Sequence, residues 1–116
     1  MAIKTLNKKV TGATTSAAFG PVPAGKEWII KLIASEIVTG GATASLTLEV
    51  DGVAVAKDDS IGALGEITNL VGGSGANIIP ENTFATDGQS VSVIRGSGGG
   101  FTFDAHMSYL ERDIPT

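Results

Sequence analysis

The stretch from Pro21 to Ser35 constrains the fold of this chain more than any other. Its two prolines and Gly25 predict a turn, because proline fixes φ and cannot donate to a β-ladder. The residues that follow, from Glu27 onward, are mostly apolar and predict a strand. This strand contains Trp28, the only tryptophan of a chain in which aromatic residues make up 5%. A core with so few aromatic rings must form around those it has, so we expect Trp28 to anchor the fold.

Strand alternation predicts which side chains accompany Trp28 in the core. Every second residue of a strand points to the same face, and the pattern from Phe101 to Leu110 alternates as clearly as the one after Trp28. The predicted core anchors are Trp28, Ile30, Leu32, Phe101 and Phe103. The other face of the Trp28 strand is also largely apolar. We therefore expect that face to be covered by an N-terminal arm or by another subunit.

Turn signals divide the rest of the chain into short segments. Asp51-Gly52 is the strongest of them, because a two-residue type I′ hairpin needs positive φ at both positions. The segment 58–80 is expected to be a loop, with a short helical turn capped by its first residues and strands near 66–71 and 76–79. No long helix is predicted anywhere.

These features predict an all-β fold. With 116 residues, 42% of them hydrophobic, and 16 glycines, the chain has the size and composition of one globular domain rich in tight turns. We predict a single antiparallel β-sandwich or jelly-roll-like domain of about eight short strands. Residues 21–112 are expected to form this domain, residues 1–20 an extended arm or edge strand, and residues 113–116 a tail.

Composition also excludes several classes of protein. The absence of cysteine excludes a disulfide framework, a thiolate metal site and a cysteine nucleophile. The first residues lack the apolar region of a signal peptide, and no apolar run approaches the roughly 20 residues of a membrane span. We therefore expect a soluble protein that is made in a cytoplasm and binds no membrane.

Charge is distributed unevenly along the sequence. Residues 1–31 carry five lysines against one glutamate, a net charge of +4, whereas the remaining residues carry three cations against eleven carboxylates, a net charge of −8. One interpretation is a basic arm that docks on an acidic partner, including a second copy of this chain. The other is that lysines keep a strand edge soluble. The acidic body and scarce aromatic residues argue against binding of nucleic acid.

The sequence contains few candidates for chemistry. Asp104 and His106 share one face of a strand, where they could form part of a base-and-orienter pair or bind a metal, but their polar strand face favours a structural role. The stretch 96–100 lacks the lysine and helix of a phosphate-binding loop, so it predicts a hairpin loop. Scattered carboxylates could bind calcium, although their spacing matches no EF-hand and favours turn caps: Asp58, Asp59, Glu66, Glu81 and Asp87. No cofactor or metal is predicted, and we expect no enzymatic activity.

The sequence resembles small β-sandwich virion proteins of tailed bacteriophages, most closely the capsid decoration, or cement, proteins. The pattern V-P-A-G-K-x-W-x-I, an Asp-Gly hairpin, a D-G-x-x-V-x-V strand and a last strand ending near a glutamate carry the resemblance. They match residues 22–30, 51–52, 87–93 and 108–111. The resemblance spans about residues 20–111 and brings no catalytic residues with it.

The resemblance implies a non-enzymatic protein on the outer surface of a virion. Such a protein would bind the major capsid protein of a phage head as a dimer or trimer and strengthen the head. The candidate capsid or intersubunit contacts are Ile3, Lys4, Lys8, Lys9 and Lys31. Deleting residues 2–18 is expected to leave a folded domain that no longer binds capsids. The alternatives are a tail, neck or fibre component that binds host-surface carbohydrate and, from another class, a small hydrolase that uses Asp104 and His106.

Overall fold

The computed structural model describes residues 3–40, 43–75, 77–80, 82–96 and 100–114. These residues form nine β-strands and no helix. The strands are β1 (Lys4–Ala13), β2 (Ser16–Pro21), β3 (Lys26–Thr39), β4 (Ala44–Val50), β5 (Val53–Ile61), β6 (Ile67–Val71), β7 (Thr83–Thr86), β8 (Ser90–Arg95) and β9 (Thr102–Asp113).

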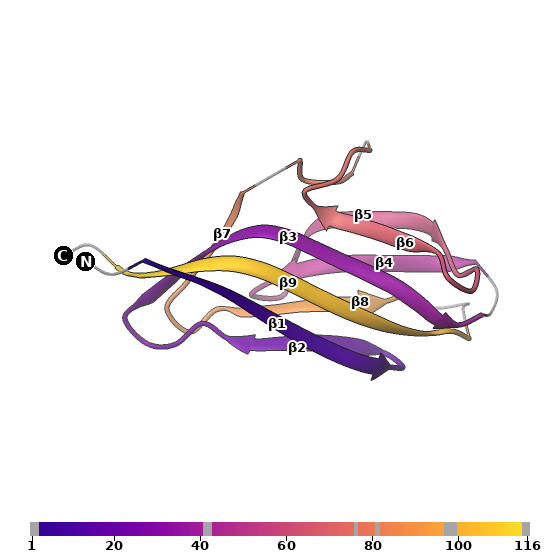
Figure 1. The fold of residues 1–116 in the computed structure, drawn as a ribbon, viewed down its shortest axis with the longest axis horizontal. Helices are drawn as coiled ribbons and strands as arrows, with labels where there is room; N and C mark the ends of the chain where they lie inside the picture. The colour runs from indigo at the N-terminus through magenta and orange to yellow at the C-terminus, as the bar shows by residue number, and fades with distance from the viewer. Residues whose placement is uncertain (1–2, 41–42, 76, 81, 97–99, 115–116) are drawn as a thin grey trace.

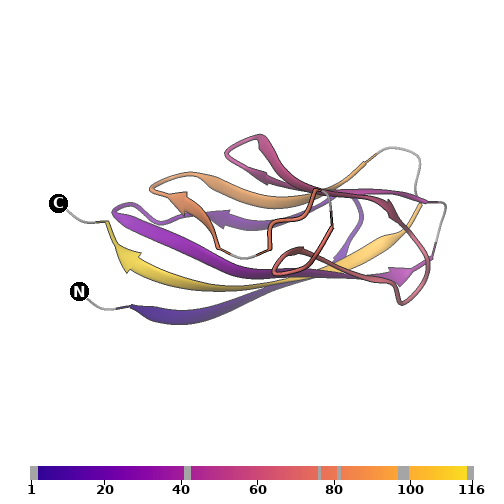
Figure 2. The same cartoon turned by 90° about the horizontal axis from the view of Figure 1, so that it is seen from above.

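The strands build two antiparallel sheets that pack face to face, which confirms the predicted sandwich. The five-stranded sheet has the order β1-β9-β3-β6, with β7 also paired to β3, and the four-stranded sheet has the order β2-β8-β4-β5. Figures 1 and 2 show the two layers, and they show that β1 begins and β9 ends at the same end of an elongated molecule of 47 × 24 × 22 Å. β1 packs beside β2 and β5 beside β6, so the sandwich has a β1/β2 side and a β5/β6 side.

Residues near the N-terminus form the edge strand of each sheet. β1 pairs with β9, and β2 pairs with β8. The chain passes from one sheet to the other just after Gly12, which has φ of +65°, a value that glycine adopts without strain. Ala13 and Ala17, on either side of this crossing, are buried in the core. Residues 1–20 were expected to form an extended arm or an edge strand, and the described residues of this segment form edge strands.

The core contains the side chains of both sheets that face inward, and Trp28, Ile30, Phe101 and Phe103 are completely buried in it. Leu32, also predicted as an anchor, is only half-buried. A β-bulge between Ile30 and Leu32 inserts an extra residue opposite β9, and this reverses the alternation. Ile33 is therefore the residue that enters the core in its place.

The hairpin between β4 and β5 forms at the predicted turn. Asp51 and Gly52 have φ of +53° and +79°, as a two-residue type I′ turn requires. The helical turn expected after residue 58 is absent, because β5 continues to Ile61 with its polar side chains in solvent. β6 forms within the expected segment 66–71, whereas at the second expected strand the structure has a single bridge from Ile79 to Val71, and Ala76 lies outside the described residues.

Candidate functional site

Asp104 and His106 have different surroundings in the structure. Both lie on the outward face of β9, but Asp104 Oδ1 accepts a hydrogen bond of 2.8 Å from the backbone N–H of Gly12. Asp104 thereby fastens the distal end of β1 to β9. His106 lies opposite Lys9 on β1, and no hydrogen bond joins it to Asp104 among the residues that the structure describes. The structure gives Asp104 a structural role, and it does not orient His106.

A shallow cavity of about 220 Å³ lies beside His106. Ser35 contributes to its wall, but Ser35 is buried on the inner face of β3, whereas His106 lies opposite Ala34 on the outer face. The sheet itself separates the Ser35 hydroxyl from the His106 ring. A serine–histidine–aspartate arrangement is therefore not built here.

The scattered carboxylates are used locally. Asp58 Oδ1 accepts the N–H of Ser60, Asp87 Oδ1 accepts the N–H of Gly25, and Glu66 Oε1 accepts two backbone N–H groups of its own turn. Asp59 forms an ion pair of 3.2 Å with Lys57, and Glu81 lies outside the described residues. Within the described ranges, no three acidic or histidine side chains gather as a metal site would require.

The five predicted contact residues have different surroundings. Ile3, Lys4 and Lys9 are exposed along the β1 edge. Lys8 points into the sandwich, where its Nζ donates to the Phe19 carbonyl at 3.0 Å and lies 4.9 Å from the centre of the Trp28 ring. Lys31 Nζ donates to Asn82 Oδ1 at 2.6 Å. Lys8 therefore covers one end of the core, whereas Ile3, Lys4, Lys9 and Lys31 are exposed.

Lys8 belongs to a polar cluster around Trp28 that sequence patterns did not predict. Trp28 Nε1 donates to Glu111 Oε2 at 2.9 Å, and the rings of Trp28 and Tyr109 lie 4.7 Å apart. The sequence signal was slight: Lys8 and Glu111 occupy inward positions of strands whose other inward residues are apolar. The cluster satisfies the indole N–H in the core, as a buried tryptophan requires.

The cluster predicts an alkaline shift in the titration of the only tyrosine. Burial, followed by the nearby Glu111 carboxylate, raises the pKa of the Tyr109 hydroxyl above its ordinary value of 10.0. We expect the tyrosinate absorbance of the native protein to rise with a midpoint above pH 10.0. Because the folded-state pKa is the higher one, the stability linked to Tyr109 is present below pH 10.0 and is lost as the pH rises through the folded pKa. A native midpoint at or below that of the urea-unfolded chain would contradict this expectation.

An apolar row crosses the outer face of the five-stranded sheet. Ile29 on β3 lies opposite Leu110 on β9 and opposite Phe84 on β7. Phe84 is 53% exposed, and the other two side chains are half-buried. Beside the row, Arg112 Nε donates to Glu27 Oε1 at 2.7 Å. The row was not predictable as a unit, because its residues meet only through strand pairing. An apolar centre with a polar border is typical of a protein-binding surface.

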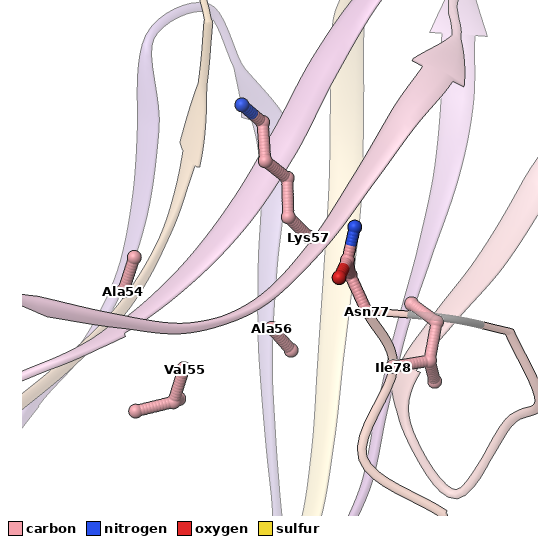
Figure 3. A pocket seen from close by; sticks show the side chains of 6 residues that line it. All are labelled: Ala54, Val55, Ala56, Lys57, Asn77 and Ile78. Atoms are coloured by element: carbon pink, nitrogen blue, oxygen red, sulfur yellow. The ribbon is translucent and has the colours of Figure 1, made fainter.

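Figure 3 shows a second feature, a groove along the outer edge of β5. It has a volume of about 490 Å³ and is lined by Ala54, Val55, Ala56, Lys57, Asn77 and Ile78. An adjoining hollow of about 250 Å³ extends it past Asp58 and Asp59. The groove therefore combines small apolar side chains with the exposed backbone of an edge strand.

Comparison with known proteins gives no family. No family model matches the chain, and no curated protein matches it. Among solved structures, a Bacillus endospore appendage described as a disulfide-linked pilus is 11% identical, with a TM-score of 0.49 over 98% of this chain and 88% of that one. A capsid structure of a Helicobacter pylori bacteriophage is 14% identical, with a TM-score of 0.44 over 94% of this chain and 100% of that one. A carbohydrate-binding domain of a termite-gut xylanase is 12% identical, with a TM-score of 0.34 over 97% of this chain and 72% of that one.

At these identities and scores the likenesses carry no argument about function. In the part of the chain that the structure describes, no helix has the length and apolar character needed to cross a membrane.

Proposed function

We propose that this chain is a non-enzymatic structural protein of a bacteriophage virion, which binds the major capsid protein on the outside of the head and stabilises it. The observation that carries this proposal is the apolar row of Ile29, Phe84 and Leu110 on the outer face of the five-stranded sheet. A row of this kind fits another protein surface better than a small molecule, because it lies across a sheet face. The resemblance of residues 22–30 and 87–93 to virion proteins supports the same function.

The mechanism would depend on many modest contacts. Each copy would bury its apolar row on a capsomer, with the Arg112–Glu27 pair at the border of that contact. Repetition around the head raises the effective concentration of every further contact. A sheet braced by the long β3·β9 ladder suits this task, since it presents the contact residues on a rigid surface.

The apolar row favours a capsid partner over host-surface carbohydrate. A sugar-binding site usually combines an aromatic ring with polar groups in a concave site. Phe84 is an exposed ring, but its neighbour across the ladder, Ile29, is apolar, and Phe84 lines none of the three hollows described beside β5 and His106. We therefore place the tail or fibre function second.

The proposal predicts the result of a binding experiment with heads that lack this protein. The unmodified chain is expected to co-sediment with the expanded heads of the virus that encodes it. Phe84→Ser should weaken binding by at least about tenfold, because it removes the largest and most exposed side chain of the row. Leu64→Ser is the matched control, since Leu64 is an exposed apolar residue in the turn before β6.

Thermal melts would show that both variants remain folded. Failure of the unmodified chain to bind heads would contradict the function. Full binding by Phe84→Ser, or equal loss with Leu64→Ser, would contradict the assignment of this face as the contact surface. Binding of the chain to a glycan array instead of heads would favour the carbohydrate alternative.

A further inference from the structure

The two sides of the sandwich carry opposite charge. The β1/β2 side, residues 3–21, has three lysines and no carboxylate. The described residues of the segment 53–80, which form the β5/β6 side, have Lys57 against Asp58, Asp59 and Glu66. Because β1 and β5 are edge strands of different sheets on opposite sides, the excess of positive charge and the excess of negative charge face away from each other. Such a distribution favours contact between the β1/β2 side of one copy and the β5/β6 side of another.

The edge of β5 is open to an additional strand. Lys57 N–H donates to the Asn77 carbonyl at 2.8 Å, so one position of this edge already pairs outward. Closer to the hairpin, the pairing of β4 with β5 skips Val55, and Figure 3 shows Val55 and Ala56 on the same side of the strand, as a bulge requires. Val53, next along the edge, is 63% exposed. An edge strand with exposed β-branched residues is a template for pairing with another chain.

The β1 side carries both apolar and basic side chains. Leu6 and Val10 on β1 point toward the core but are only partly buried, since β1 is the last strand of its sheet. Their exposed parts add apolar surface to this edge, and the groove on the other side is lined in part by the apolar side chains of Val55, Ala56 and Ile78. Lys4 and Lys9 are exposed on the same strand.

We propose that the β1 edge of one copy docks in the β5 groove of a second copy, so that the basic side that carries Lys4 and Lys9 faces the acidic side that carries Asp58 and Asp59. The contact is head to tail, because the two copies contribute different surfaces. It therefore leads to a closed ring when the rotation between copies closes and to an open chain otherwise. It leaves the apolar row on the outer sheet face free. The proposed self-association goes beyond capsid binding. It is tested on purified protein without heads, so the proposal of self-association and the proposal of capsid binding succeed or fail separately.

Sedimentation analysis of charge variants tests the proposal. The unmodified protein should sediment at low salt as a multiple of its 11.7 kDa mass, and it should dissociate progressively as salt screens the charges. Lys4→Glu combined with Lys9→Glu should weaken association at least about tenfold, and so should Asp58→Lys combined with Asp59→Lys. The chain with all four substitutions should associate again, because its charges are complementary in the reverse sense.

The control exchanges charges elsewhere. Lys31→Glu combined with Glu36→Lys changes two exposed residues of β3 and should leave self-association unchanged. Circular dichroism would establish that every variant is folded. An unmodified protein that remains monomeric at low salt would overturn the proposal. Self-association that survives either pair of charge reversals would also overturn it. So would a fourfold variant that does not associate, or a β3 control that has lost its self-association.

Discussion

A chain that lacks residues 2–18 should fail to fold cooperatively. The deletion removes β1 and half of β2, and with them the buried Ala13 and Ala17, so that both sheets lose an edge strand. β9 would become the edge strand of its sheet, and β8 would lose half of its pairing with β2. Large apolar residues on the inner faces of both strands would then face water. The deletion also removes Lys8, which covers the Trp28 ring. We expect the far-ultraviolet circular dichroism of a sheet to be lost and the Trp28 emission to shift to that of a solvated indole.

This expectation replaces the one drawn from sequence, in which residues 2–18 could be deleted without unfolding the domain. The matched control is removal of Ala2 and Ile3 alone, which precede β1 and should leave the spectra and the thermal melt unchanged. A cooperative melt in the longer deletion would show that the two sheets are stable without their edge strands. It would then contradict the contribution assigned here to β1 and β2.

Trp28→Ala should lower the free energy of unfolding by about 3–5 kcal/mol. The ring is completely buried, contacts Tyr109, and donates its N–H to Glu111, so the variant leaves both a cavity and an unpaired carboxylate at the end of the core. A loss of this size is a large share of the roughly 5–15 kcal/mol by which most domains are stable. Urea denaturation followed by circular dichroism would measure it.

Two further variants make the Trp28 experiment specific. Trp28→Phe keeps a ring beside Tyr109 but loses the hydrogen bond to Glu111, so it should destabilise less than Trp28→Ala. Leu64→Ala, in an exposed turn, should change the free energy of unfolding by no more than about 0.5 kcal/mol. A Trp28→Ala variant as stable as the Leu64→Ala control would show that the core does not depend on this ring.

The parts of the fold that sequence predicted are those set by local rules. Asp51-Gly52 specifies its hairpin because both residues accept positive φ. The inward residues of β9 follow strict alternation from Phe103 to Tyr109. The prediction failed for Leu32, because a bulge in β3 depends on how β9 and β7 pair with it and leaves no local mark in the sequence. It failed also after Asp58, where carboxylates that usually cap turns lie on an edge strand in solvent.

The candidate surfaces were less predictable than the fold. Asp104 and Gly12, which are hydrogen-bonded, are 92 residues apart in the chain, and Trp28 and Glu111 are 83 apart. The apolar row likewise joins three strands that are distant in sequence. Sequence identified the basic character of residues 1–31, but only the strand order assigns its lysines to different environments, with Lys8 inside and Lys9 outside.

The position of the two chain ends determines how this molecule responds to force. β1 begins and β9 ends at the same end of the sandwich (Figure 1), and Lys4 lies opposite Glu111 in the ladder between them. A pull applied between residues 3 and 114 would therefore break the hydrogen bonds between β1 and β9 one after another. The force needed would be small, because only a few bonds bear the load at any moment. A pull directed along β3 would instead have to shear its long ladder with β9 all at once. The sandwich can therefore carry a mechanical load through its sheets far better than through its termini.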